Sequence, residues 1–374
     1  MEVSKVYNQQ VFFELVRAGL WEKDVRLSEF GGIDFNKVYQ LAEEQSVIGL
    51  IAAGLQHIVD VRVPQIEFLT FIGRAVQLEQ QNSAMNMFIE NLVEKMRKAD
   101  ICTLLVKGQG IALCYERPLW RSCGDVDLFL DDDNYKKAKA FLIPMASKVD
   151  PEGMYNNHLG MTIDSWIVEL HGSLRNGLSS RMDRNLDELK ELVFRGGNVR
   201  SWMNGNTLVL LPGVDCDILF VFTHFIKHFY VEGLGLRQIC DWCRLLWTYR
   251  SEIDKALLEK RLHSMGLLTE WKAFGAFAVD YLGMPSDSMP LYSSNHKWRK
   301  KADRICSFVM EVGNMGHNRD SSYKTKCPYV IRKFFSLSRR FGDLLHHAKI
   351  FPMDSMRFFF KIVSVGLGAA ARGE

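Results

Sequence analysis

The segment Gly124-Asp125-Val126-Asp127-Leu128-Phe129 decides how this sequence is interpreted. Residues 125–130 predict a strand, and the strand period of two places the side chains of Asp125 and Asp127 on one face. Two carboxylates that point the same way repel each other unless a cation lies between them. Because Mg²⁺ prefers oxygen ligands, the pair predicts a magnesium site on this strand.

A second predicted strand supplies a third carboxylate. Residues 166–171 follow a strand pattern in which Glu169 has the alternation needed to join the two aspartates. Three carboxylates would complete a two-metal site for displacement at phosphorus. Asp164 is the alternative third ligand, but Asp164-Ser165 is the predicted hairpin turn between strands 155–163 and 166–171. Glu169 is therefore preferred.

Upstream of the two aspartates, the sequence predicts a strand, a tight turn and a helix. Residues 101–106 are rich in β-favouring types, Lys107-Gly108-Gln109-Gly110 follows, and residues 111–115 have a helical pattern. The backbone N–H groups at such a helix start can bind a phosphate, and glycine allows its close approach. A plain turn with no ligand is the alternative.

The remaining sequence predicts an α+β protein in three parts. Residues 1–100 form a helical segment with breaks at Gly31-Gly32 and Val63-Pro64, residues 101–212 form an α/β core with a small mixed sheet, and residues 213–374 are helical. Asp131-Asp132-Asp133 is interpreted as the cap of a helix over 134–142 rather than as a metal site.

The order of these elements resembles a known superfamily. A strand, Lys107-Gly108, a helix, Arg121, the Asp-Val-Asp strand and Val168-Glu169-Leu170-His171 look like the nucleotidyltransferase superfamily, which has the DNA polymerase β-like fold. More narrowly, the chain is similar to the bacterial uncharacterised nucleotidyltransferase family over roughly residues 10 to 250. The resemblance implies a mixed-sheet nucleotidyltransferase core flanked by helical regions.

The resemblance also implies an activity. A nucleoside monophosphate would move from a nucleoside triphosphate, with ATP preferred, to an acceptor hydroxyl or phosphate, and pyrophosphate would leave. Mg²⁺ would be the cofactor, and Glu169 would be either the third metal ligand or a base. A non-catalytic nucleotide-binding or regulatory protein with the same fold is the alternative. The implied ligands are Asp125, Asp127 and Glu169 for metal, and Lys107, Gly108, Arg121 and Gly124 for nucleotide phosphates.

The helical second half contains two polar pairs at a spacing of four residues. His224 and His228 share one helix face, and Arg237 and Asp241 share another. The resemblance places all four in a substrate pocket. The alternative is that they only fix helix packing, since a zinc site would need at least one more ligand.

Composition indicates a folded protein without a strong polyanionic partner. The chain has 374 residues, 47% hydrophobic and 24% charged, with a formal charge of +3, so nothing signals nucleic acid and the expected acceptor is a small molecule or protein. No secretory signal or membrane span is predicted, and the expected location is the cytoplasm. The eight cysteines are scattered, and Cys240 and Cys243 are interpreted as ordinary helix residues.

Basic and aromatic residues interleave between positions 332 and 361. A helical bundle with basic edges is preferred there over a helix that lies on a membrane surface.

Overall fold

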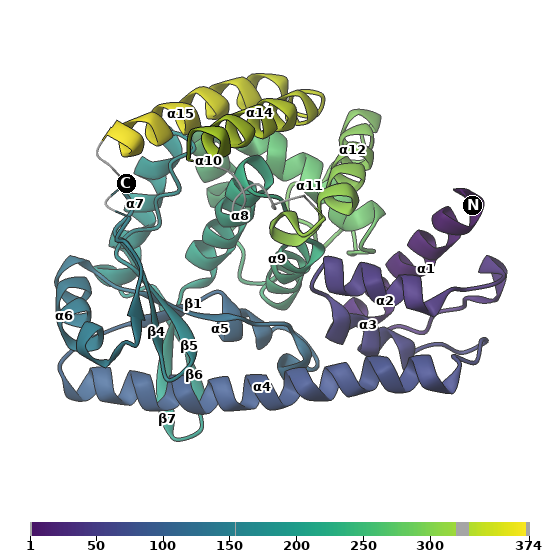
Figure 1. Ribbon diagram of the computed structural model, residues 1–374, viewed down its shortest axis with the longest axis horizontal. Helices are drawn as coiled ribbons and strands as arrows, with labels where there is room; N and C mark the ends of the chain where they lie inside the picture. Colours follow the sequence, from purple (N-terminus) through teal and green to yellow (C-terminus); the bar gives the residue numbers. More distant parts are fainter. Residues whose placement is uncertain (1, 154, 319–328, 372–374) are drawn as a thin grey trace.

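The computed structural model describes residues 2–153, 155–318 and 329–371. They form an α+β protein in which one mixed sheet is flanked by helices from both ends of the chain (Figure 1). The predicted fold class is confirmed.

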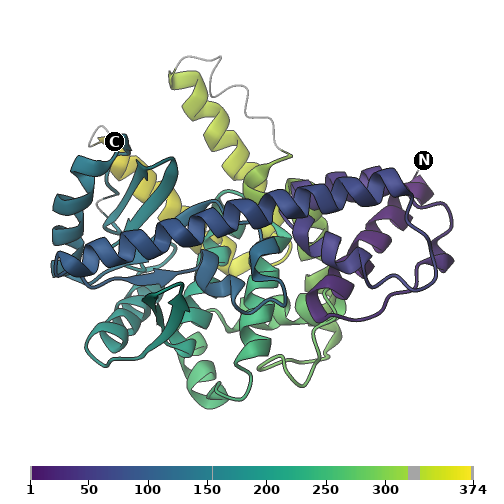
Figure 2. The same ribbon diagram turned by 90° about the horizontal axis from the view of Figure 1, so that it is seen from below.

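The N-terminal segment is helical, and both predicted breaks lie between helices, but a further break at residues 45–47 was not predicted. Asp34 caps the second helix by accepting hydrogen bonds from the backbone N–H groups of Asn36 and Lys37. The fourth helix begins directly after Pro64 and runs for 34 residues along one side of the molecule (Figures 1 and 2). The helices are α1 (Glu2–Trp21), α2 (Phe35–Glu44), α3 (Ile48–Leu55) and α4 (Gln65–Lys98).

The sheet has seven strands in the order β3-β4-β5-β2-β1-β7-β6. β2 pairs in parallel with β5 and antiparallel with β1, which places the Asp-Val-Asp strand centrally. The sequence analysis missed β3, which is an exposed two-residue edge strand without a hydrophobic pattern. The strands are β1 (Leu104–Val106), β2 (Asp125–Phe129), β3 (Lys148–Val149), β4 (His158–Ile163), β5 (Trp166–His171), β6 (Val199–Asn204) and β7 (Thr207–Pro212).

The two faces of the sheet have different partners. Val126 and Leu128 belong to an apolar cluster with residues of α4 and of α6 (Asp132–Leu142). Strand alternation turns Asp125 and Asp127 to the opposite face. Asp131 caps α6 by accepting from the backbone N–H of Asn134, which confirms the interpretation of the acidic triplet as a cap.

The face that carries the aspartates is covered by helices from the second half of the chain. α8 and α9 are the important ones for the site, because both line the cavity described below. The remaining helices are α5 (Gly108–Ala112), α7 (Ser180–Phe194), α8 (Val214–Val231), α9 (Leu236–Thr248), α10 (Lys255–Met265), α11 (Leu268–Asp280), α12 (His296–Val312), α14 (Tyr329–Ala348) and α15 (Pro352–Ala371).

One large buried apolar cluster joins the helices of both ends of the chain to β1. The division into parts at residues 100 and 212 therefore stays a prediction. At the end of the chain α14 and α15 pack on each other (Figure 1). In the basic and aromatic run, the side chains of residues 332–337 and 340 lie outside the described residues. Among the described helices, none has both the length and the apolar composition needed to cross a bilayer.

Candidate active site

Three carboxylates meet on two neighbouring strands. In the parallel pairing of β2 with β5, Asp127 lies directly opposite Glu169, and Asp125 precedes it by one strand period. One ligand oxygen from each of the three residues lies within 4.8 Å of the others. Such a set of hard oxygen donors fits a divalent cation such as Mg²⁺. The structure thus brings together the three residues that the sequence analysis selected, and Asp164 lies apart in the β4–β5 turn with a positive φ of 48°.

The local charges show what this closeness costs. The charge of Asp127, followed by burial, raises the pKa of the Asp125 carboxyl. Lys107 partly compensates, because its Nζ lies 2.6 Å from the Oδ1 atom of Asp127. Burial acts to lower the pKa of Lys107, but the carboxylates of Asp127, Asp125 and Glu169 together outweigh burial and raise the pKa above its ordinary value. The lysine therefore stays charged within the cluster.

Two histidines that the sequence analysis did not select also touch the carboxylates. The Nε2 atom of His171 lies 2.7 Å from the Oδ1 atom of Asp127, and that of His158 lies 3.0 Å from the Oε2 atom of Glu169. Although burial acts to raise the pKa of Glu169, hydrogen bonds from both histidines hold it well below its ordinary value. His158, Glu169 and His171 are also close enough to share a metal ion. The histidines thus orient the carboxylates or supply nitrogen ligands beside them.

The turn after β1 has an unusual backbone. Lys107 has a positive φ of 56° and Gly108 one of 38°. A Cβ atom at position 108 would lie 3.2 Å from the Sγ atom of Cys123, so the turn has little room for a side chain. Non-glycine residues seldom adopt positive φ, and such conformations concentrate at functional sites.

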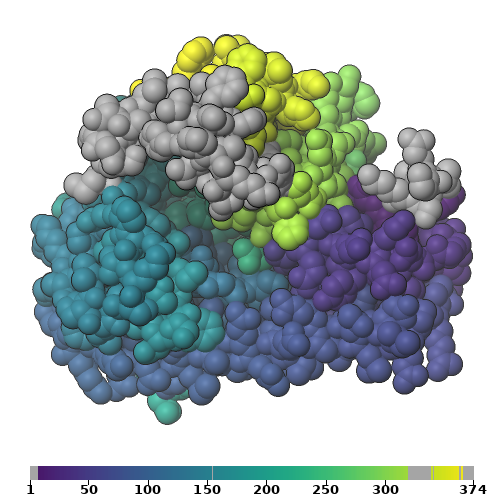
Figure 3. Space-filling model, in the orientation of Figure 1, coloured from purple at the N-terminus to yellow at the C-terminus, as the bar shows by residue number. Residues whose placement is uncertain are grey.

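The carboxylates face a cavity of about 310 Å³. A hollow is visible in the space-filling view between the teal sheet region, the green helices and the purple N-terminal helices (Figure 3). Gly124 is exposed and is the one sequence-selected residue that does not line the cavity, because it precedes β2 at the surface. The selected residues that line it are Lys107, Gly108, Arg121, Asp125, Asp127, Glu169, His224, His228, Arg237 and Asp241.

Arg121 and Asp241 form a buried ion pair at the cavity wall. The Nε and Nη2 atoms of Arg121 donate to the two carboxylate oxygens of Asp241 at 2.9 and 2.6 Å. The hydroxyl of Tyr115 donates to the same carboxylate at 2.9 Å. The guanidinium fork of Arg121 is thus occupied by a protein carboxylate and holds the 115–121 loop to α9.

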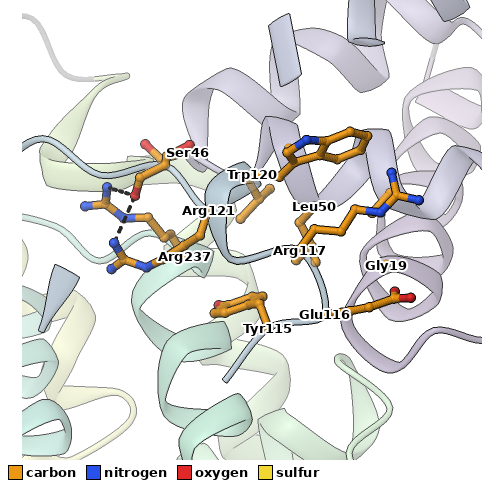
Figure 4. A pocket seen from close by; sticks show the side chains of 13 residues that line it. Gly19, Ser46, Leu50, Tyr115, Glu116, Arg117, Trp120, Arg121 and Arg237 are labelled. Carbon is orange, nitrogen blue, oxygen red and sulfur yellow. Dashed lines mark hydrogen bonds between the residues drawn. The ribbon is translucent and has the colours of Figure 1, made fainter. Parts of the chain in front are cut away.

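A second, apolar pocket lies on the other side of this loop, against α1 and α3 (Figure 4). Arg121 and Arg237 line both pockets and both donate to the carbonyl oxygen of Ser122, at 3.2 and 3.0 Å. A Cβ atom at Gly49 of α3 would lie only 1.9 Å from the carbonyl oxygen of Trp120, so helix and loop are in direct backbone contact. The pocket is a packing crevice that supports the arginine-bearing loop.

The loop is also fixed from α4. The side-chain amide of Asn82, which is fully buried, donates to the carbonyl oxygens of Leu119 and Arg121 at 2.7 and 2.8 Å. Gln109 of α5 donates in turn to the Oδ1 atom of Asn82 at 2.9 Å. The long helix therefore positions both the loop and the helix that follows the Lys107-Gly108 turn.

The histidine pair of α8 lies on the wall opposite the sheet. The Nε2 atoms of His224 and His228 are 3.0 Å apart, and the Nδ1 atom of His228 is 2.8 Å from a carboxylate oxygen of Glu232. Neither histidine belongs to a group of three potential metal ligands among the described residues. Burial, with the nearby charge of Lys107, holds the pKa of His224 well below its ordinary value of 6.5. We therefore expect a neutral imidazole at this wall.

This lowered pKa predicts a pH-dependent stability. Below pH 6.5 the unfolded chain binds a proton at His224 and the folded chain does not. This group therefore lowers the free energy of unfolding by up to about 1.4 kcal/mol for each pH unit as pH falls. Urea unfolding at pH 7.5, 6.5 and 5.5 should show a smaller acid-induced loss for His224→Gln than for the wild type. Equal losses in the two proteins would contradict a neutral buried His224.

The two cysteines of α9 behave as the sequence analysis expects. Cys240 and Cys243 are both buried, and burial raises the pKa of each thiol. Neither forms part of a potential metal site among the described residues. The cysteines are packing residues of the helix.

Clustered carboxylates, a lysine turn and an adjoining polar cavity define a site suited to a metal-bound anionic ligand. The sequence model of a family described as uncharacterised nucleotidyltransferases matches residues 31–283, well over half of the chain. The chain belongs to this family, which confirms the family predicted from the sequence, although the match begins and ends later than the predicted range of roughly residues 10 to 250. Searches of curated proteins and of solved structures found no significant match.

Proposed function

We propose that this protein transfers a nucleoside monophosphate from a nucleoside triphosphate, with ATP preferred, to an acceptor by a two-metal mechanism. The observation that carries the proposal is the cluster of Asp125, Asp127 and Glu169 on adjacent strands facing a cavity. Family membership supports nucleotidyl transfer in general. The identity of the ions, the donor and the acceptor belongs to the proposal.

The three carboxylates would hold Mg²⁺ ions, which when bound supply Lewis-acid stabilisation of the charge that develops at phosphorus. The lowered pKa of Glu169 favours the role of metal ligand over that of base. Lys107, charged and held beside Asp127, adds positive charge on the same side as the Gly108 turn. These residues would place the donor triphosphate at the edge of the sheet near Asp125.

In the proposed reaction, an oxygen of the acceptor attacks the α-phosphate in line. A phosphorus–oxygen bond forms to the acceptor, and the bond to the β-phosphate breaks with its electron pair on the departing pyrophosphate. The acceptor proton is released to water. Asp125 and Asp127 would hold the ions that keep the donor in this geometry.

Calorimetric titration of the four nucleoside triphosphates, with and without Mg²⁺, tests the proposal. The wild type should bind one of them in a magnesium-dependent manner, and Asp125→Ala/Asp127→Ala should lose that binding because the metal ligands are gone. Asp132→Ala/Asp133→Ala is the matched control, since it removes the same charge from the exposed first turn of α6. Folded wild type that binds no triphosphate would leave only a non-catalytic interpretation of the fold.

A further inference from the structure

Lys227 is a cation on the cavity wall that has no bonded partner among the residues that the structure describes. It lies on α8 between His224 and His228 and lines the cavity. Within the described residues its ammonium group makes no hydrogen bond and no ion pair. The charges of Glu232, Lys107 and Glu169 act on it from a longer distance. Burial lowers the pKa of Lys227, and Lys107 acts in the same direction against Glu232 and Glu169. A bound anion would stabilise the charged form of such a buried ammonium group.

The other cations of the cavity differ from Lys227 because each has a hydrogen-bonded partner. Arg237 donates to the carbonyl oxygen of Ser122, although its Nε atom is buried without a partner. The remaining three are bound to carboxylates: Lys107 to Asp127, Arg121 to Asp241 and Arg175 to Asp187. Lys227 is thus the cavity cation most available to a ligand.

Strand pairing distinguishes the two ends of the cavity. The Gly108 turn lies beside the start of β2, since a Cβ atom at Gly108 would be 3.5 Å from the carbonyl oxygen of Asp125. His171, the last residue of β5, pairs with Phe129, the last residue of β2, so the loop after β5 lies at the opposite end. The cavity that Lys227 lines therefore extends from the Gly108 turn to the loop after β5.

That end of the cavity offers uncharged hydrogen-bonding groups. The loop after β5 contributes Ser173 and Asn176 to the lining, and Asn156 and His158 lie before and at the start of β4. Asp183, in the first turn of α7, already accepts hydrogen bonds from Tyr155 and from the backbone N–H groups of residues 176 and 177. The side-chain amide of Asn176 already donates to the carbonyl oxygen of Thr223, so the charge of a bound anion would be met by Lys227 on the wall of the same cavity.

We propose that Lys227 binds an anionic oxygen group, a phosphate or a carboxylate, on the acceptor substrate. The inference rests on the proposed function, in which the donor triphosphate occupies the Gly108 turn beside Asp125. A lysine ammonium binds such a group as a point charge. The acceptor is then an anionic molecule whose attacking oxygen reaches the metal site beside Glu169.

The test is a titration of protein saturated with Mg²⁺ and the α,β-methylene analogue of the nucleotide that it binds. Inorganic phosphate is titrated in one arm and succinate in the other, so that the two sources of negative charge are distinguished. Wild type should bind one of them, and Lys227→Gln should weaken that binding at least about 10-fold while nucleotide affinity changes less than about twofold. Lys227→Arg should restore anion binding.

Lys260→Gln is the matched control, because Lys260 is exposed and does not line the cavity. Thermal unfolding of each variant shows that the fold is intact. Anion binding that is absent in the wild type or unchanged in Lys227→Gln would overturn the proposal, as would a 10-fold loss of nucleotide affinity, which would assign Lys227 to the donor. Wild type that binds no nucleotide, yet binds phosphate through Lys227, would refute the proposed function and retain the anion site.

Discussion

Replacing Asp127 by asparagine should lower the rate of pyrophosphate release from the bound triphosphate about 10³-fold. Asp127 is 2% exposed and lies opposite Glu169, so its oxygen atoms are proposed to serve the metal ions directly. A bound metal ion contributes several kcal/mol of charge stabilisation in the transition state, which a lost ligand would weaken, and each 1.4 kcal/mol is about 10-fold in rate. The rate is measured with water as the acceptor, by enzyme-coupled detection of pyrophosphate.

The control for this prediction is Asp164→Asn, in the exposed turn that separates β4 from β5. Its rate should stay within about twofold of the wild type, since surface substitutions usually have small effects. Asparagine at 127 also removes the negative charge that pairs with Lys107 and His171, so the unfolding midpoint is measured alongside. An unchanged rate in a folded Asp127→Asn protein would remove this residue from the site.

Replacing Asp241 by alanine should destabilise the fold by about 3–5 kcal/mol. The variant leaves the Arg121 guanidinium buried without its carboxylate, and loss of one partner of a buried pair has this magnitude. The hydroxyl of Tyr115 loses its acceptor at the same time. Urea unfolding at neutral pH gives the difference in the free energy of unfolding.

The pair of Arg175 with Asp187 provides the comparison, because its geometry is similar but its side chains are more exposed. Asp187→Ala should cost only about 0–1 kcal/mol. The double variant Arg121→Ala/Asp241→Ala should be less destabilised than the sum of its single variants, because no unpaired charge remains. Additive losses would show that the two groups are not coupled.

The pair of aspartates could be predicted from the sequence because alternation places Asp125 and Asp127 on one face of a strand whatever surrounds them. The choice of Glu169 used the same alternation together with the order of elements in the resembling family, since its place beside Asp127 depends on the pairing of β2 with β5. His158 could not be found in this way. Its contact with Glu169 depends on the pairing of β4 with β5, which no local pattern specifies.

The charged residues show a different limit. The sequence identifies Arg121 as a cation near the site. Its ion pair with Asp241 could not be predicted, because it depends on how α9, 120 residues further along the chain, packs against the loop. Lys227 differs from Arg121 because it has no bonded partner among the described residues, and its helical spacing gives no indication of this. Gly124 was selected from its neighbours, and the structure places it at the surface.

The close approach of α3 to the 118–121 segment lets the N-terminal helices position a loop that lines the cavity, although α3 itself does not line it. A methyl group at Gly49 would meet the carbonyl oxygen of Trp120, which is backbone and cannot rotate away, one residue before Arg121. A side chain at position 49 would therefore displace the backbone that leads to Arg121 at the cavity wall. The permitted size of this residue of α3 is set by a loop that lines the cavity on its other side.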